Sequence, residues 1–132
     1  MIATFYDRQD LRNPANGTRI NSDQQICALF ENLKSRSPFF CELVGGNGYN
    51  LLVGIGGNIG CAQYGRADGK PPYLMATQPE LKSKTGLKTF LTGDTATPIP
   101  ERYCLDFGII RNIVLYFLDQ GLRSAAVLWE EI

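Results

Sequence analysis

Residues 39–64 have the sequence FFCELVGGNGYNLLVGIGGNIGCAQY, and this stretch decides the fold. Three apolar runs rich in β-branched and aromatic residues, typical of strands, occupy positions 39–44, 49–55 and 59–64. Glycine-rich connections separate them, and the pair Asn47-Gly48 suits the positive φ angles of a tight hairpin turn. The stretch therefore predicts three adjacent antiparallel strands.

The residues before this stretch predict a strand and a helix. Positions 2–6 form a short β-branched and aromatic run, and the turn-rich segment 13–17 predicts a loop. Ser22 is a good N-cap residue, with Gln25 placed to reach back to the cap amide. Apolar residues then recur at the spacing of one helical face, namely Ile26, Leu29, Phe30 and Leu33.

The residues after it predict two more strands, an exposed loop, a second helix and a closing strand. The strands are expected at 73–76 and 89–91, separated by a polar, irregular segment. Segment 92–100 is rich in Pro and Thr and is expected to be an extended exposed loop. Asp106 is expected to cap a helix that ends at Gly121, and residues 125–129 close the chain as a strand. The buried side of this helix is expected to carry Phe107, Ile110, Val114, Phe117 and Leu118.

These elements together predict an α+β fold. We expect a mainly antiparallel sheet of about five to seven strands with two helices packed on it. Residues 1–132 contain no internal repeat and no linker long enough to divide them. We therefore expect a single domain.

Composition and charge exclude several classes of protein. The sequence has 13 basic and 13 acidic residues and a pI near 6.2, which argues against direct nucleic-acid binding. The apolar runs are too short to cross a bilayer, and the N-terminus has no features of a secretory signal, so we expect a cytosolic protein without membrane contact. The four cysteines lack metal-ligand spacing and are expected to be buried thiols.

The sequence matches no known motif for catalysis or for cofactor binding. The tract 54–60, GIGGNIG, fails the dinucleotide pattern because Ile59 occupies the last glycine position and a strand, not a helix, follows. The sequence contains no histidine, which excludes Ser-His, Cys-His and His-metal mechanisms. We expect no enzyme activity, no cofactor and no metal.

From Leu51 to its end, the chain resembles the first-numbered immunity-protein family of bacterial polymorphic-toxin systems. The resemblance rests on the order and spacing of six short segments. They are Leu52-Val53-Gly54-Ile55-Gly56-Gly57, Gln63-Tyr64, Pro71-Pro72-Tyr73, Thr97-Pro98-Ile99-Pro100, Phe117-Leu118-Asp119-Gln120-Gly121 and Val127-Leu128-Trp129-Glu130-Glu131.

The resemblance implies a cytoplasmic protein that is encoded beside a secreted toxin and inhibits it by direct binding. The implied partner is a deaminase-fold toxin that acts on nucleic-acid bases, with a cytosine deaminase as the expected case. We expect the inhibitor to occlude the active site, with carboxylates meeting the basic groups of the toxin and aromatic rings stacking where a base would lie. The expected contact residues are Tyr64, Asp68, Tyr73, Asp94, Trp129, Glu130 and Glu131.

Three other interpretations remain open at the level of sequence. The antiparallel sheet and its glycine-rich hairpins are compatible with a small-ligand or regulatory binding domain. A carboxylate pair, for example Asp68 with Asp94, is compatible with an enzyme. Exposed sheet edges are compatible with self-association.

Overall fold

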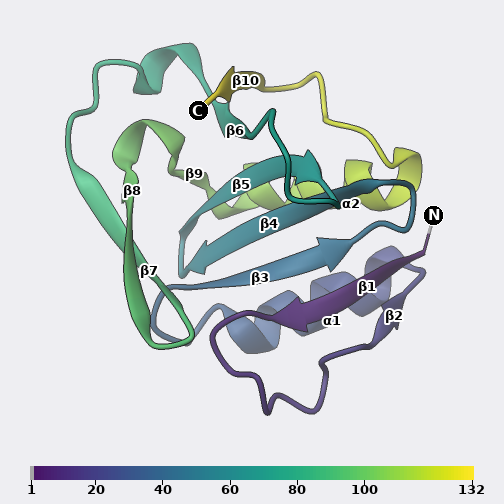
Figure 1. The fold of residues 1–132 in the computed structure, drawn as a ribbon. Helices are drawn as coiled ribbons and strands as arrows, with labels where there is room; N and C mark the ends of the chain where they lie inside the picture. Colours follow the sequence, from purple (N-terminus) through teal and green to yellow (C-terminus); the bar gives the residue numbers. More distant parts are fainter. Residues whose placement is uncertain (1) are drawn as a thin grey trace.

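A computed structural model describes residues 2–132 and shows two helices on one face of a ten-stranded, mainly antiparallel sheet (Figure 1). The main path of the sheet runs β10-β6-β5-β4-β3-β1-β2, with β7, β8 and β9 attached beside it. Its strands are β1 (Ala3–Asp7), β2 (Arg19–Ile20), β3 (Phe39–Val44), β4 (Tyr49–Gly56), β5 (Ile59–Arg66), β6 (Leu74–Thr77), β7 (Leu87–Thr92), β8 (Thr95–Pro100), β9 (Leu105–Asp106) and β10 (Leu128–Glu131). The α+β prediction is confirmed, but the predicted five to seven strands are too few.

The three central strands lie as the sequence predicts. β3 pairs with β4, and β4 with β5, both antiparallel and in continuous register. In the β4–β5 turn, Gly57 supplies the positive φ of 74°. The β3–β4 connection differs from the prediction, because its positive φ angles lie at Gly46 and Gly48 and not at Asn47.

The first helix, α1 (Asp23–Leu33), begins at the predicted cap. The Ser22 hydroxyl accepts a hydrogen bond from the backbone amide of Gln25. The side chains of Ile26, Phe30 and Leu33 are buried against the sheet. The Gln25 side chain accepts a hydrogen bond from the backbone amide of Asn21. The predicted partner was the backbone amide of the cap residue, Ser22. Cap and apolar stripe together explain why this segment is helical.

The second helix, α2 (Phe107–Gln120), ends at Gly121, which has the predicted left-handed backbone with φ 70°. Its start differs from the prediction, because the Asp106 side chain makes no capping hydrogen bond. The first helical amide, that of Phe107, instead donates to the carbonyl of Asn58 in the β4–β5 turn. This helix is therefore anchored at its N-terminus by the central hairpin.

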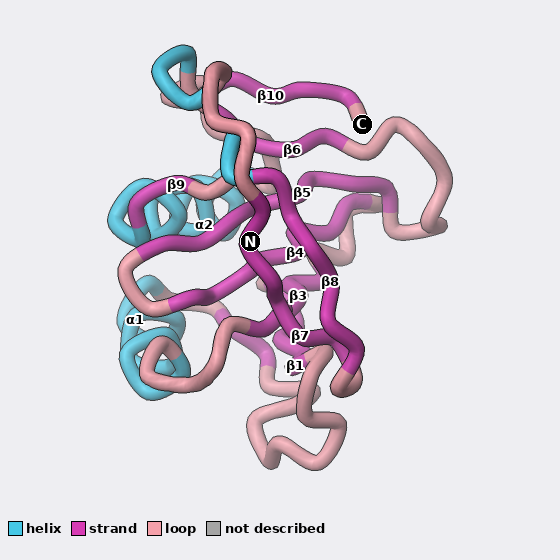
Figure 2. Tube along the Cα trace, turned by 90° about the vertical axis from the view of Figure 1, so that its left-hand side faces the viewer, coloured by secondary structure: helices cyan, strands magenta, loops and turns pink. Residues whose placement is uncertain are grey.

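The opposite face of the sheet is partly covered by the β7–β8 hairpin (Figure 2). Segment 92–100 is extended and mostly exposed as predicted, but the expectation of a loop is wrong, because Thr95–Pro100 forms β8 and pairs with β7. Positive φ angles at Gly93 and Asp94 fit a two-residue turn whose twist matches the strands. Phe90 of β7 is fully buried in a second apolar cluster with Phe40, Cys61, Met75 and Tyr103. The molecule thus has three layers: helices, sheet and hairpin.

The glycine-rich tract 54–60 lets both outer layers approach the sheet closely. A Cβ added to Gly54 would lie 2.5 Å from the Cys61 sulfur and 2.9 Å from the ring of Phe90. A Cβ added to Gly60 would collide with the backbone carbonyl of Gly54 and press against Ile110 of α2. Packing therefore explains these glycines.

The ends of the chain extend slightly beyond the predicted elements. β1 includes Asp7, and β10 covers Leu128–Glu131 rather than 125–129. No helix within residues 2–132 is long and apolar enough to cross a membrane.

Candidate binding surface

An open groove of about 880 Å³ lies at the end of the sheet where β4 begins and β5 ends. This is the right-hand side of the sheet in Figure 1, where the β3–β4 connection and the end of α2 meet. We call it the tyrosine groove, and its lining residues are Gly48, Tyr49, Tyr64, Gly65, Arg66, Ala67, Asp68, Pro72, Leu74, Leu122 and Arg123.

Two stacked tyrosines form part of the lining of the tyrosine groove. The rings of Tyr49 and Tyr64 are nearly parallel, with centroids 5.0 Å apart. Tyr64 is only 6% exposed, and its hydroxyl donates to the carbonyl of Gly121 at 3.3 Å. Desolvation, reinforced by Tyr49 and opposed by Arg123, raises the pKa of Tyr64, so this ring stays neutral at physiological pH. Tyr49 is 39% exposed, and its ring stacks on the buried ring of Tyr64.

Trp129 supports this pair from β10. Its ring lies edge-on to Tyr64 with centroids 6.3 Å apart, and its indole N–H donates to the carbonyl of Ser124 at 2.9 Å. The side chain is half-buried and packs against the main core. Trp129 therefore acts as a structural anchor in the free chain, and its contact with a partner stays a prediction.

The rim of the tyrosine groove carries three charged side chains. Arg66 and Asp68 form an ion pair of 2.5 Å, and both are exposed. The amide of Lys70 and the guanidinium of Arg66 hold the pKa of Asp68 below its usual range. Arg123 lies over the Tyr64 ring at 5.7 Å from its centroid and forms no ion pair with any residue between 2 and 132. The lining thus carries two positive charges and one negative charge.

Tyr73 lies beside the tyrosine groove but does not line it. Its hydroxyl donates to the carbonyl of Gly69 at 2.5 Å, and its carbonyl accepts the amide of Ile132. The side chain is half-buried and braces the β5–β6 connection. Its role as a partner contact stays a prediction.

Glu130 and Glu131 lie on β10 and do not line the tyrosine groove. Glu130 accepts two hydrogen bonds from Arg102 at 2.6 and 2.7 Å and one from the Tyr103 hydroxyl. The hydrogen bonds from Arg102 lower the pKa of Glu130, which keeps it ionised. Glu131 is exposed and lines a second, smaller groove of about 450 Å³ together with Met75, Ile99 and five further residues. Among the four predicted carboxylates, only Glu131 has neither an ion pair nor a side-chain hydrogen bond within residues 2–132.

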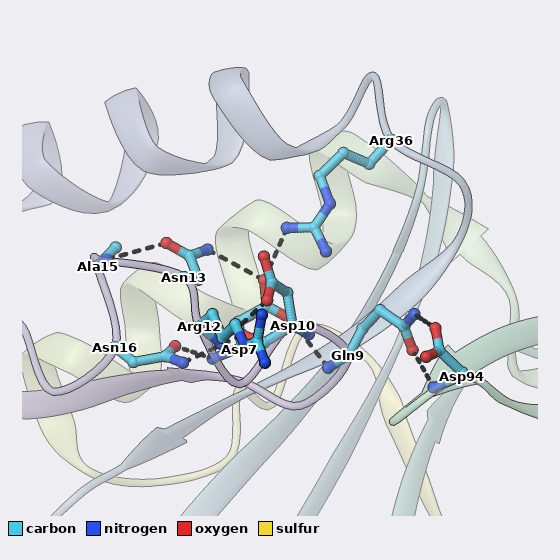
Figure 3. Close-up of polar contacts among 9 residues, drawn as sticks. All are labelled: Asp7, Gln9, Asp10, Arg12, Asn13, Ala15, Asn16, Arg36 and Asp94. Atoms are coloured by element: carbon cyan, nitrogen blue, oxygen red, sulfur yellow. Dashed lines mark hydrogen bonds and ion pairs between the residues drawn. The ribbon is translucent and has the colours of Figure 1, made fainter.

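Asp94 lies far from the other predicted contact residues, at the tip of the β7–β8 hairpin. In Figure 1 this tip is at the lower left, whereas the tyrosine groove is on the right. Its carboxylate accepts a hydrogen bond from the side-chain Nε2 of Gln9 at 2.5 Å, and its backbone amide donates to the side-chain Oε1 of Gln9 at 2.7 Å (Figure 3). Asp94 therefore fastens the hairpin to the segment that follows β1.

A buried carboxylate that the sequence did not indicate lies next to this contact. Asp7 is fully buried, pairs with Arg36 at 2.7 Å, and accepts the amides of Gln9 and Asp10 (Figure 3). Burial alone would raise its pKa, but these hydrogen bonds and a further one from Asn13 outweigh burial and lower it. Asp7 thus holds the 8–17 loop in one shape and is an anion at neutral pH.

Three exposed residues of the tyrosine groove, Tyr49, Leu122 and Arg123, are not among the residues predicted from the sequence. Tyr49 lies at the start of β4, in phase with the buried residues of that strand, and so resembled a core position. Leu122 and Arg123 follow a helix-ending glycine, where no periodic pattern applies. Gly121 predicts that the helix ends there, but it does not predict that the next two residues line a groove.

The cysteines offer no chemistry at this surface. Cys41 and Cys61 are fully buried, and burial raises the pKa of both thiols. Cys27 and Cys104 are half-buried, and all four are unpaired. Within residues 2–132 no three Cys, Asp or Glu side chains are grouped as metal ligands.

Comparison with known proteins identifies the family. The family model described as immunity protein Imm1 matches residues 15–131. This match begins well before Leu51 and covers both α-helices, the whole lining of the tyrosine groove and nine of the ten strands of the sheet. A search of curated proteins gave no match. The chain therefore belongs to the Imm1 family of immunity proteins.

Proposed function

We propose that this chain protects the cell that makes it by binding and inhibiting a cognate secreted toxin. The toxin is a deaminase-fold enzyme that acts on nucleic-acid bases, with a cytosine deaminase as the expected case. Membership of the Imm1 immunity family is the observation that carries the proposal. The chain acts in the cytoplasm, as one binding domain without catalytic activity of its own.

Inhibition occurs by covering the active site of the toxin. An enzyme of this class takes a flipped or single-stranded base into a narrow pocket, so a bound protein that blocks the approach of the nucleic-acid strand stops turnover. An interface of about 1,600 Å² with a few aromatic or charged anchors is enough for nanomolar affinity or better. The whole end of the sheet around the tyrosine groove is available for such a contact.

The predicted contact residues have distinct parts in this proposal. Glu131 is the carboxylate best placed to meet a basic group of the toxin, because no group between residues 2 and 132 neutralises it. Asp68 and Glu130 already form ion pairs with Arg66 and Arg102 in the free chain. Each of them meets the toxin as part of its ion pair and not as a free carboxylate. Tyr64, Tyr73 and Trp129 support the surface from below, and Asp94 contributes only if the interface reaches the hairpin tip.

A deamination assay tests the proposal. The toxin domain encoded beside this gene is purified and given a single-stranded cytosine-containing substrate, with increasing amounts of the chain. We expect the rate to fall to background at about one equivalent, and an unrelated Imm1 protein to leave it unchanged. Full activity in the presence of excess protein would falsify the proposed function.

A further inference from the structure

We propose that the tyrosine groove binds an acidic loop of the toxin, one that carries an Asp or Glu beside a large apolar side chain. The inference rests on the proposed function and names the chemistry of one contact within it. It concerns a different part of the toxin from the basic groups assigned to Glu131, because the tyrosine groove carries the opposite charge.

The apolar half of the site consists of exposed side chains that the fold does not use. Tyr49 is 39% exposed and Leu122 is 54% exposed, and both line the tyrosine groove. Tyr49 cannot turn away freely because it stacks on Tyr64, which is fixed by its hydroxyl and by Phe117 and Trp129 around it. A large, rigid aromatic side chain at a concave surface is the usual anchor of a protein interface.

The charged half of the site determines which charge the bound segment of the partner must carry. Arg66 is neutralised by Asp68, whereas Arg123 keeps an uncompensated charge. Its guanidinium is already positioned over the Tyr64 ring, so little side-chain freedom is lost when a carboxylate binds it. A carboxylate that enters the tyrosine groove beside an apolar side chain therefore meets a fixed cation and a fixed ring together.

Other occupants fit less well. A second copy of the chain would need an exposed acidic and apolar segment, for example Asp10-Leu11 or Glu131-Ile132. A small anion would use Arg123 but leave Tyr49 and Leu122 uncovered. The second-copy alternative is one outcome of the experiment below.

Three groove variants and three matched controls test the inference by their affinity for the purified toxin domain. Arg123→Glu is paired with Arg111→Glu, which makes the same change in net charge on the exposed side of α2. Tyr49→Ser is paired with Tyr116→Ser, because Tyr116 is 38% exposed and lies outside both grooves. Leu122→Ser is paired with Leu87→Ser.

We expect Arg123→Glu to weaken binding about 100-fold and Tyr49→Ser about 30-fold, with each control within about twofold of wild type. Thermal unfolding of every variant checks that the fold is intact. Affinity for Arg123→Glu should return when one Asp or Glu of the toxin is changed to Lys. This reciprocal recovery does not depend on the stability of any single variant.

The possible failures are distinguishable. If wild type inhibits the toxin but the groove variants bind as tightly as their controls, the inference is wrong and the proposed function stands. If wild type neither binds nor inhibits, both are wrong. If wild type is a dimer that Arg123→Glu dissociates, a second copy occupies the tyrosine groove, and the inference is again overturned.

Discussion

Gly54 shows how a single residue sets the distance between two layers. It lies under the ring of Phe90, at a point where any side chain would meet that ring and the Cys61 sulfur. Gly65 lies on the neighbouring strand, and a Cβ added there would have no atom within 4 Å. Neither glycine has a positive φ, so an alanine at either position meets no backbone strain of that kind. The two positions therefore differ only in the atoms that surround them.

We predict that Gly54→Ala lowers the free energy of unfolding by about 1–3 kcal/mol, because the added methyl overpacks the contact between sheet and hairpin. Gly65→Ala should change it by less than about 0.5 kcal/mol. Urea denaturation of both variants provides the measurement. Equal stability of the two variants would contradict the packing explanation of the glycine-rich tract.

Asp7 gives the chain a defined acid sensitivity. Its native pKa is lowered below the ordinary value of 3.8, so the folded state favours the anion. The resulting stabilisation is complete above that value and is lost as the pH falls through the lower native pKa. We predict that Asp7→Asn lowers the free energy of unfolding at pH 7 by about 2–4 kcal/mol, because Arg36 loses its buried partner.

The difference between wild type and Asp7→Asn should therefore shrink as the pH falls below about 4. Chemical denaturation between pH 7 and pH 2.5 measures it. Asp10→Asn is the control, since Asp10 is exposed and its carboxylate bonds only to the amide of Arg12 in its own loop. A difference that stays constant down to pH 2.5 would rule out the anion as the source of the stabilisation.

Burial of Asp7 could not have been predicted from sequence. The residue ends an apolar run and is followed by polar residues, which is the ordinary pattern of a strand that reaches solvent. Its burial depends on Arg36, 29 positions away, and on the 8–17 loop folding back over it. Only the tertiary fold brings those groups together.

At the scale of elements, the two helices and three central strands follow from local patterns, whereas β8 does not. The stripes of α1 and α2 and the runs of β3, β4 and β5 have the right period for one buried face. β8 contains Pro98 and Pro100, which cannot donate hydrogen bonds and therefore predict a loop. The strand forms because both prolines fall at register positions opposite Thr89 and Leu87, where their nitrogens face the free edge.

This placement predicts a role for the two prolines in keeping the edge of the sheet unpaired. We predict that a Pro98→Thr, Pro100→Thr double variant self-associates at concentrations where wild type does not, because two new amides face outward from β8. Light scattering over a concentration series is the measurement, with Pro14→Thr in an exposed loop as the control. An unchanged molar mass for the double variant would show that the edge is protected in another way.

At the scale of the molecule, the predicted contact residues fall into three places. Tyr64 and Asp68 line the tyrosine groove, and Trp129 and Tyr73 lie beside it. Glu130 and Glu131 lie on β10, and Asp94 is at the opposite end of the sheet (Figure 1). Exposure depends on packing, so the sequence indicated the buried Tyr64 and not the exposed Tyr49 and Arg123 that line the same groove.

Survival of cells that express the cognate toxin domain is the decisive measurement for the proposed function. Cells that also make the wild-type chain should survive, and cells that make an Arg123→Glu, Tyr49→Ser variant at the same level should be killed. The Arg111→Glu, Tyr116→Ser control should protect as wild type does. Death of the cells that contain wild type would contradict the assignment as an immunity protein, and equal protection by both double variants would contradict the tyrosine groove as its binding surface.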